Sequence, residues 1–174
     1  AVYCQHTTAK EVCIMSIEKV KAFFAAKGCA DRVRELPTSS ATVALAAAAL
    51  GCEPARIAKT MSFRGKEGYI LVVAAGDARI DNAKFKHTFG VKATMLPHDE
   101  VEPAIGHAVG GVCPFAVNDG VAVYLDASLR RFETVFPACG SANSAIEVTL
   151  PELAAFAAPV EWVDVCKLPE TSQG

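Results

Sequence analysis

Long apolar runs are missing from this sequence of 174 residues. A membrane-spanning helix needs about 20 consecutive apolar residues, whereas the alanine-rich stretch Ala41–Leu50 is only ten residues long and predicts a buried helix. We therefore expect no membrane partner. With 52% hydrophobic and 21% charged residues, the composition is typical of a globular chain and argues against disordered or fibrous classes.

Paired cysteine motifs are also absent, although the chain holds seven cysteines. Their number is odd and they are scattered without a Cys-x-x-Cys pair, which argues against a disulfide framework and favours reduced thiols in a cytoplasmic protein. His98, His107 and Cys113 lack the close spacing of typical zinc ligands. We therefore predict neither a metal nor a cofactor.

Internal repeats, linkers and low-complexity tracts are missing as well, and the length suits one domain. Residues 1–14 lack the basic and then apolar pattern of a signal peptide, and we expect them to be a poorly ordered leader. Residues 15–166 are expected to form the domain, and residues 167–174 a tail. Ser16 is the expected N-cap of the first helix.

The remaining pattern is a helix, a strand and a helix, followed by many strands that short helices interrupt. It predicts a single α/β domain of the α+β type with a mixed, strongly curved sheet. The clearest strands are Ala58–Phe63 and Tyr69–Ala75. In the first, the period of two places Lys59 on the core-facing side with Met61. Such a lysine either reaches solvent from the strand end or lines a pocket.

The most unusual stretch runs from Gly106 to Phe115, with further glycines at 110 and 111 and a proline at 114. Adjacent glycines permit positive φ and let a ligand approach main-chain N–H groups, while Pro114 favours an extended Cys113. Two interpretations stay open. The stretch is either a backbone cradle for a ligand or an ordinary turn between a helix and a strand.

Charge is distributed unevenly along the chain, whose formal net charge is −2. Residues 56–92 hold eight basic and three acidic side chains, a net charge of +5, which leaves −7 for the remainder. This asymmetry is typical of a local phosphate-facing patch on a mildly acidic domain, and also of an ordinary solvated face.

A convincing catalytic nucleophile is missing. His107 lies six residues before Cys113, but no nucleophile elbow surrounds this cysteine, and Ser39, Ser40 and Ser144 are more typical of caps and loops. A glycine loop and an inward lysine without a nucleophile suit an ester that needs positioning and oxyanion donors. Aminoacyl-tRNA is such an ester, because the 2′-OH of its terminal ribose adjoins the scissile bond.

Three segments carry a family resemblance: ARIAKTMSF at 55–63, GGVCPF at 110–115 and VYLDASL at 123–129. They resemble the YbaK/ProX family of aminoacyl-tRNA deacylases, which is similar to the editing domain inserted in bacterial prolyl-tRNA synthetases, over about residues 16–157. The resemblance implies a barrel-like mixed sheet flanked by helices. It also implies a hydrolase that acts in trans on mischarged tRNA, with tRNA(Pro) carrying Ala, Cys, Ser or a similar small amino acid as the expected substrate.

By the same resemblance, Lys59 matches the family's essential lysine, which binds the terminal adenosine's phosphate or ribose. Gly110 and Pro114 match its Gly-x-x-x-Pro loop, whose amides hold the aminoacyl carbonyl. We therefore expect catalysis to depend on Lys59, Gly110, Gly111 and Pro114. The expected substrate-binding residues are Ser39, Ser40, Met61, Val112, Cys113, Gly140, Ser141 and Asn143.

One departure concerns the amino acid that is removed. Alanine-specific members carry a His-Pro-x-x-Asn element near the second loop, whereas here Phe136 precedes Pro137 and no histidine stands nearby. Alanine specificity therefore stays open. So do two other functions: a non-catalytic module of the same fold that binds tRNA or a synthetase, and a small-molecule-binding protein.

Overall fold

The computed structural model describes residues 9–170, with side chains from Ser16 onward. Its α-helices are α1 (Ala9–Ala25), α2 (Val43–Leu50), α3 (Asn82–Phe89), α4 (His98–Ile105) and α5 (Leu150–Ala157). Its strands are β1 (Arg34–Glu35), β2 (Ile57–Arg64), β3 (Tyr69–Ala75), β4 (Arg79–Ile80), β5 (Val121–Asp126), β6 (Thr134–Pro137), β7 (Ser144–Ala145), β8 (Val148–Thr149), β9 (Glu161–Val163) and β10 (Cys166–Lys167). No helix in the described range is long and apolar enough to cross a membrane.

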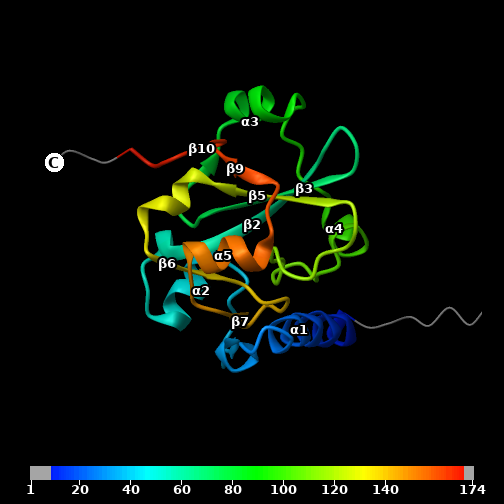
Figure 1. Cartoon of the computed structure of the whole chain (residues 1–174), viewed down its shortest axis with the longest axis vertical. Helices are drawn as coiled ribbons and strands as arrows, with labels where there is room; N and C mark the ends of the chain where they lie inside the picture. The colour runs from blue at the N-terminus through cyan, green and yellow to red at the C-terminus, as the bar shows by residue number, and fades with distance from the viewer. Residues whose placement is uncertain (1–8, 171–174) are drawn as a thin grey trace, which may run out of the picture.

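A six-stranded sheet with the order β8-β6-β2-β3-β5-β9 forms the centre of the molecule. The pairs β2–β3 and β6–β8 are antiparallel, while β2–β6, β3–β5 and β5–β9 are parallel. Figure 1 shows α3 on one side of this sheet and α1, α2 and α5 on the other. The predicted single α/β domain with a mixed, curved sheet is confirmed.

Aromatic residues fill the core on both faces of the sheet. Strand β3 lies between the two layers, and its residues 71–75 are all fully buried, which explains its continuous apolar sequence. On the α3 side, Phe63 contacts Phe85 at a ring-centroid distance of 4.8 Å. On the other side, Phe24 of α1 contacts Phe115 at 4.9 Å and Phe156 of α5 at 5.2 Å. These contacts bind the helices to both faces of the sheet.

Several expected boundaries are wrong. Helix α1 begins at Ala9, so Ser16 is a buried residue within the helix and does not cap it. Residues 1–8 of the expected leader lie outside the described residues. Helix α2 is capped by Thr42, whose side chain accepts from the Leu45 N–H at 3.2 Å. This helix is buried on one face only, because Ala46 and Ala47 face the core while Leu45 is 47% exposed.

His107 links the Gly106–Phe115 segment to helix α1 and is itself fully buried. Its Nε2 lies 2.6 Å from the Phe115 carbonyl oxygen, and its Nδ1 lies 2.8 Å from Ser16 Oγ. Because a carbonyl only accepts, Nε2 carries the proton and Nδ1 accepts from the Ser16 hydroxyl. Burial lowers the pKa of His107 from 6.5 to about 4, so the ring is neutral at pH 7.

A capping box starts helix α5. Thr149 Oγ1 accepts from the Glu152 N–H at 3.2 Å, and Glu152 Oε1 accepts from the Thr149 N–H at 3.0 Å. Arg32 donates to the same carboxylate at 3.1 Å, and this hydrogen bond contributes most to lowering the pKa of Glu152 to about 2. The carboxylate thereby links α5 to the segment that follows α1.

The variant Thr149→Ala removes the side-chain acceptor of this capping box. We expect it to lower the free energy of unfolding by about 1 kcal/mol, measured by urea denaturation. The matched control is Thr88→Ala on the exposed surface of α3, where the same chemical change removes no cap and is expected to alter stability by less than about 0.5 kcal/mol. Equal losses in the two variants would contradict the role of the cap.

Acid should destabilise the fold through His107. Because its pKa is lower in the folded protein than the unfolded value of 6.5, the unfolded chain binds the extra proton. The contribution of His107 to the free energy of unfolding is therefore fully present above pH 6.5. About 3 kcal/mol of it is lost as the pH falls toward about 4. Urea titrations across this range should show the decline in wild type and in His87→Gln, a control at an exposed histidine of α3. The decline should be absent in His107→Gln, and its persistence there would contradict the assignment.

Candidate active site

A cavity of about 430 Å³ opens between strand β2, helix α2 and the loop that follows α4. This volume is typical of sites for small ligands. Apolar side chains form most of its wall, among them Val43, Ile57, Leu96, Val101 and Phe136. Of the residues described here, no aspartate or glutamate lines it. Lys59 and His98 are its basic lining residues. The cavity therefore suits a ligand that is recognised mainly through apolar contact and neutral hydrogen bonds.

Strand β2 presents an open backbone edge to this cavity. One edge pairs with β3 from Ala58 to Arg64, but the other pairs only at its two ends. There Ile57 and Ala58 pair with β6, and Leu96 donates its N–H to the Ser62 carbonyl at 3.1 Å. Because backbone groups of alternate residues point to opposite edges of a strand, the N–H and C=O of Thr60 point into the gap between these two pairings.

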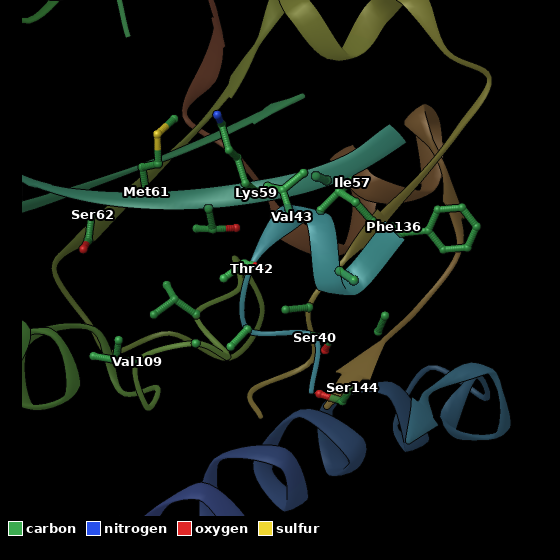
Figure 2. A pocket seen from close by; sticks show the side chains of 18 of the residues that line it. Ser40, Thr42, Val43, Ile57, Lys59, Met61, Ser62, Val109, Phe136 and Ser144 are labelled. Atoms are coloured by element: carbon green, nitrogen blue, oxygen red, sulfur yellow. The ribbon is translucent and has the colours of Figure 1, made fainter. Parts of the chain in front are cut away.

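Lys59 lies at the edge of the cavity, with its ammonium group on the other face of β2. Figure 2 shows its side chain pointing away from Ser40 and Val109. Its Nζ donates to the Ala78 carbonyl and, at 3.4 Å, to the Gly76 carbonyl. Lys59 is half-buried, and this desolvation lowers the pKa of its ammonium group. The predicted side of the strand is thus correct, but backbone carbonyls hold the amine.

In the loop after α4, glycine is required at positions 110 and 111 for different structural reasons. Gly110 has φ +89°, a left-handed conformation that side chains rarely adopt. Gly111 is required for space, because a Cβ there would lie 2.4 Å from the Ser141 nitrogen. The Gly140 N–H also donates to the Gly111 carbonyl at 2.9 Å. The first loop is therefore held by direct backbone contact with the loop 140–144.

The backbone amides of this loop are not equally available to a ligand. The Gly111 N–H donates to the Ala108 carbonyl at 3.0 Å and is therefore occupied. In the part of the chain that the structure describes, the N–H groups of Gly110 and Val112 have no hydrogen-bond partner. Both residues line the cavity. The Val109 N–H also has no partner among the described residues, and Val109 lines the cavity as well. Three amides of this loop therefore remain to bind a ligand oxygen.

Cys113 lies behind the cavity wall and not on it. Its side chain is fully buried, with Sγ 3.5 Å from His107 Nε2. Burial raises the pKa of this thiol to about 12, so it is protonated at neutral pH and cannot serve as a nucleophile. Within the described range, no cluster of three or more His, Cys, Asp or Glu side chains is placed to hold a metal ion.

The predicted site residues divide into two groups. Those that line the cavity are Ser40, Lys59, Met61, Gly110 and Val112. Those outside its lining are Ser39, Gly111, Cys113, Pro114, Gly140, Ser141 and Asn143. Several of the second group support the loops: Asn143, for example, donates to the Leu36 carbonyl at 3.1 Å.

Thr60 lines the cavity and is absent from the predicted set. A threonine within a strand has no distinctive signal in the sequence. The alternation that places Lys59 on one face of β2 nevertheless places Thr60 on the opposite face, and the cavity lies there. Ser144 also lines the cavity, although a cap or loop role was expected for it.

Three of the eight basic side chains in segment 56–92 form ion pairs within the described part of the chain. Arg56 pairs with Glu147 at 3.2 Å and Lys84 with Asp164 at 3.0 Å, and Arg64 pairs with Glu100. These acidic partners all come from outside the segment, so folding neutralises part of the local charge. Lys59 has no ion pair among the described residues, and it lines the cavity although its ammonium group lies on the other face of β2.

Comparisons with known proteins agree on one family. Residues 38–156 match the aminoacyl-tRNA editing domain. The uncharacterized protein YwhH of Bacillus subtilis is 53% identical over 154 residues, which cover 88% of this chain and 98% of YwhH. The proline–tRNA ligase of Kosmotoga olearia is 31% identical over 78 residues, 44% of this chain and 13% of the ligase.

A solved structure extends this agreement to the whole fold. The crystal structure of a candidate trans-editing enzyme for prolyl tRNA synthetase superposes with a TM-score of 0.79 at 30% identity, over 87% of this chain and 97% of that one. The match over residues 38–156 includes β2 and both loops that border the cavity. The chain therefore belongs to the aminoacyl-tRNA editing domain family.

Proposed function

We propose that this protein is a hydrolase that removes a small non-cognate amino acid from mischarged tRNA(Pro) in trans. The observation that carries the proposal is a cavity lined by unpaired backbone amides, among them those of Gly110 and Val112, beside which the described thiol of Cys113 is protonated. An aminoacyl ester is already activated, so it needs positioning and charge stabilisation more than covalent catalysis. We assign this activity to the domain at residues 15–166 and expect it in the cytoplasm, where its tRNA substrate is used.

The amides of Gly110 and Val112 supply the stabilisation in this mechanism. A water oxygen adds to the ester carbonyl carbon, and the negative charge that develops on the carbonyl oxygen is bound by the two N–H groups. The bond to the ribose oxygen then breaks, that oxygen takes the proton that the attacking water gives up, and the free amino acid leaves. One such donor contributes about 3 kcal/mol to the transition state in known hydrolases. Gly111 and Pro114 act as positioning residues for this loop.

The 3′ end of the tRNA has two binding features at the cavity mouth. Met95 and Val109 line the cavity and are 58% and 41% exposed, so they offer apolar surface to the terminal adenine. Lys59 borders the same cavity with its ammonium group on the other face of β2. In this proposal the side chain leaves its two carbonyl partners and turns toward the cavity mouth to bind the phosphate or ribose. An ammonium group hydrogen-bonds more strongly to a charged phosphate than to a neutral carbonyl oxygen.

The variant Lys59→Ala tests this assignment. We expect the rate of amino-acid release from mischarged tRNA(Pro) to fall by about 10- to 100-fold, the loss typical of a charged hydrogen bond, with an unchanged circular dichroism spectrum. Lys27→Ala is the matched control, because Lys27 is exposed and lies outside the cavity. Full activity in Lys59→Ala would contradict the mechanism.

The alternative is a module of the same fold that binds tRNA or a synthetase without catalysis. Its supporting observation is that the Lys59 ammonium group is engaged by backbone carbonyls on the other face of β2. It predicts tRNA binding that weakens steeply with salt, with no release of amino acid above the spontaneous rate. Measuring both quantities on one preparation separates the two functions.

A further inference from the structure

We infer that the cavity selects an acyl group that carries a hydroxyl, a seryl or threonyl ester, and that the side chains of Ser40 and Thr60 recognise that hydroxyl. The inference rests on the proposed function and specifies its substrate class. Its starting point is a pair of buried oxygen atoms, Ser40 Oγ and Thr60 Oγ1. Neither has a hydrogen-bond partner within the described residues, and both residues line the cavity.

The neighbouring hydroxyls of Ser141 and Ser144 have hydrogen-bond partners. Within the described residues, the lack of partners is therefore particular to the buried hydroxyls of Ser40 and Thr60. Ser141 Oγ and Ser144 Oγ lie 2.8 Å apart and bond each other, and Figure 2 shows Ser144 close to Ser40. Ser40 itself is only 9% exposed. Its position is set by its backbone N–H, which donates to the Ala142 carbonyl at 2.6 Å. The fold thus holds the Ser40 hydroxyl in place and leaves its hydrogen-bonding capacity to a ligand.

Unpaired hydroxyls in an apolar cavity discriminate between ligands. A buried polar group without a partner destabilises a complex, whereas an apolar isostere at the same place does not. A hydroxyl both donates and accepts, so a hydroxyl on the ligand pairs readily with Ser40 or Thr60. An alanyl or prolyl side chain offers no such group, and a site built to bind a hydroxyl disfavours the analogue that lacks it.

The other polar groups of the ester have better partners than these two hydroxyls. The α-ammonium group is common to all the esters and is best served by a carbonyl or carboxylate. No acidic side chain among the described residues lines the cavity, but the Thr60 carbonyl lies on the open edge of β2. The ester carbonyl is assigned to the amides of Gly110 and Val112. The side-chain hydroxyls remain for the variable part of the substrate.

The test compares kcat/KM for tRNA(Pro) charged with Ser, Thr, Ala or Pro. We expect wild type to favour the better of the seryl and threonyl esters over the alanyl ester by at least about tenfold. Thr60→Val and Ser40→Ala should each reduce this preference by about fivefold to tenfold, the value of one hydrogen bond. Their activity on the alanyl ester should change less than their activity on the preferred ester. Neither variant should lower the melting temperature, since each removes an unpaired buried hydroxyl.

Thr38→Val is the matched control, because it replaces a hydroxyl on the same segment at an exposed residue outside the cavity. It should keep the wild-type preference. An alanyl ester that is hydrolysed as fast as the seryl and threonyl esters would overturn the inference and leave the proposed function intact. Equal losses on all esters in Thr60→Val and Ser40→Ala would overturn it as well. Release neither from these four esters nor from the cysteinyl ester would instead overturn the proposed function.

Discussion

The site depends on the close backbone approach of two loops, one after α4 and one after β6. A Cβ at Gly111 would lie 2.4 Å from the Ser141 nitrogen, and a Cβ at Gly140 would lie 2.7 Å from the Ser16 carbonyl oxygen. Both distances are too short for any side chain. The two loops and helix α1 therefore meet at glycine positions, and His107 strengthens the junction through Ser16 and Phe115.

This junction determines which groups face the cavity. With Gly111 fixed against the second loop, its amide is occupied by Ala108, while Gly110 and Val112 border the open space. The buried and protonated Cys113 lies behind them. The local geometry thus supplies hydrogen-bond donors for a developing negative charge and removes the thiol from the reaction, which is consistent with a hydrolase that relies on positioning.

Polar groups without partners gather on the opposite wall as well. The Thr60 backbone lies on the open edge of β2, and the hydroxyls of Thr60 and Ser40 have no hydrogen-bond partner among the described residues. These missing hydrogen bonds lower the stability of the protein without its ligand. The rest of the fold compensates for this loss of stability, because β2 pairs with β3 from Ala58 to Arg64 and helix α2 is capped at both ends. Functional sites commonly hold such unsatisfied groups, since a substrate that supplies the missing partners is recognised by them.

The sequence alone determined the elements whose signals are local. Alternation predicted β2, a continuous apolar run predicted β3, and the motifs around Lys59 and the glycine loop identified the family. Helix α1 was predicted too short, because the expected start at Ser16 ignores an earlier local signal: Thr8 and Glu11 have the spacing of a capping box in the sequence, at the point where the helix begins.

Tertiary structure alone decided which residues face the cavity. The direction of the Lys59 amine, the burial of Cys113 and the roles of Gly110 and Gly111 depend on contacts with other segments of the chain and on no local pattern. Thr60 belongs to the site only because β6 and the 94–96 segment leave the middle of one edge of β2 unpaired. Long-range strand pairing is a property of the whole chain, and no local pattern encodes it.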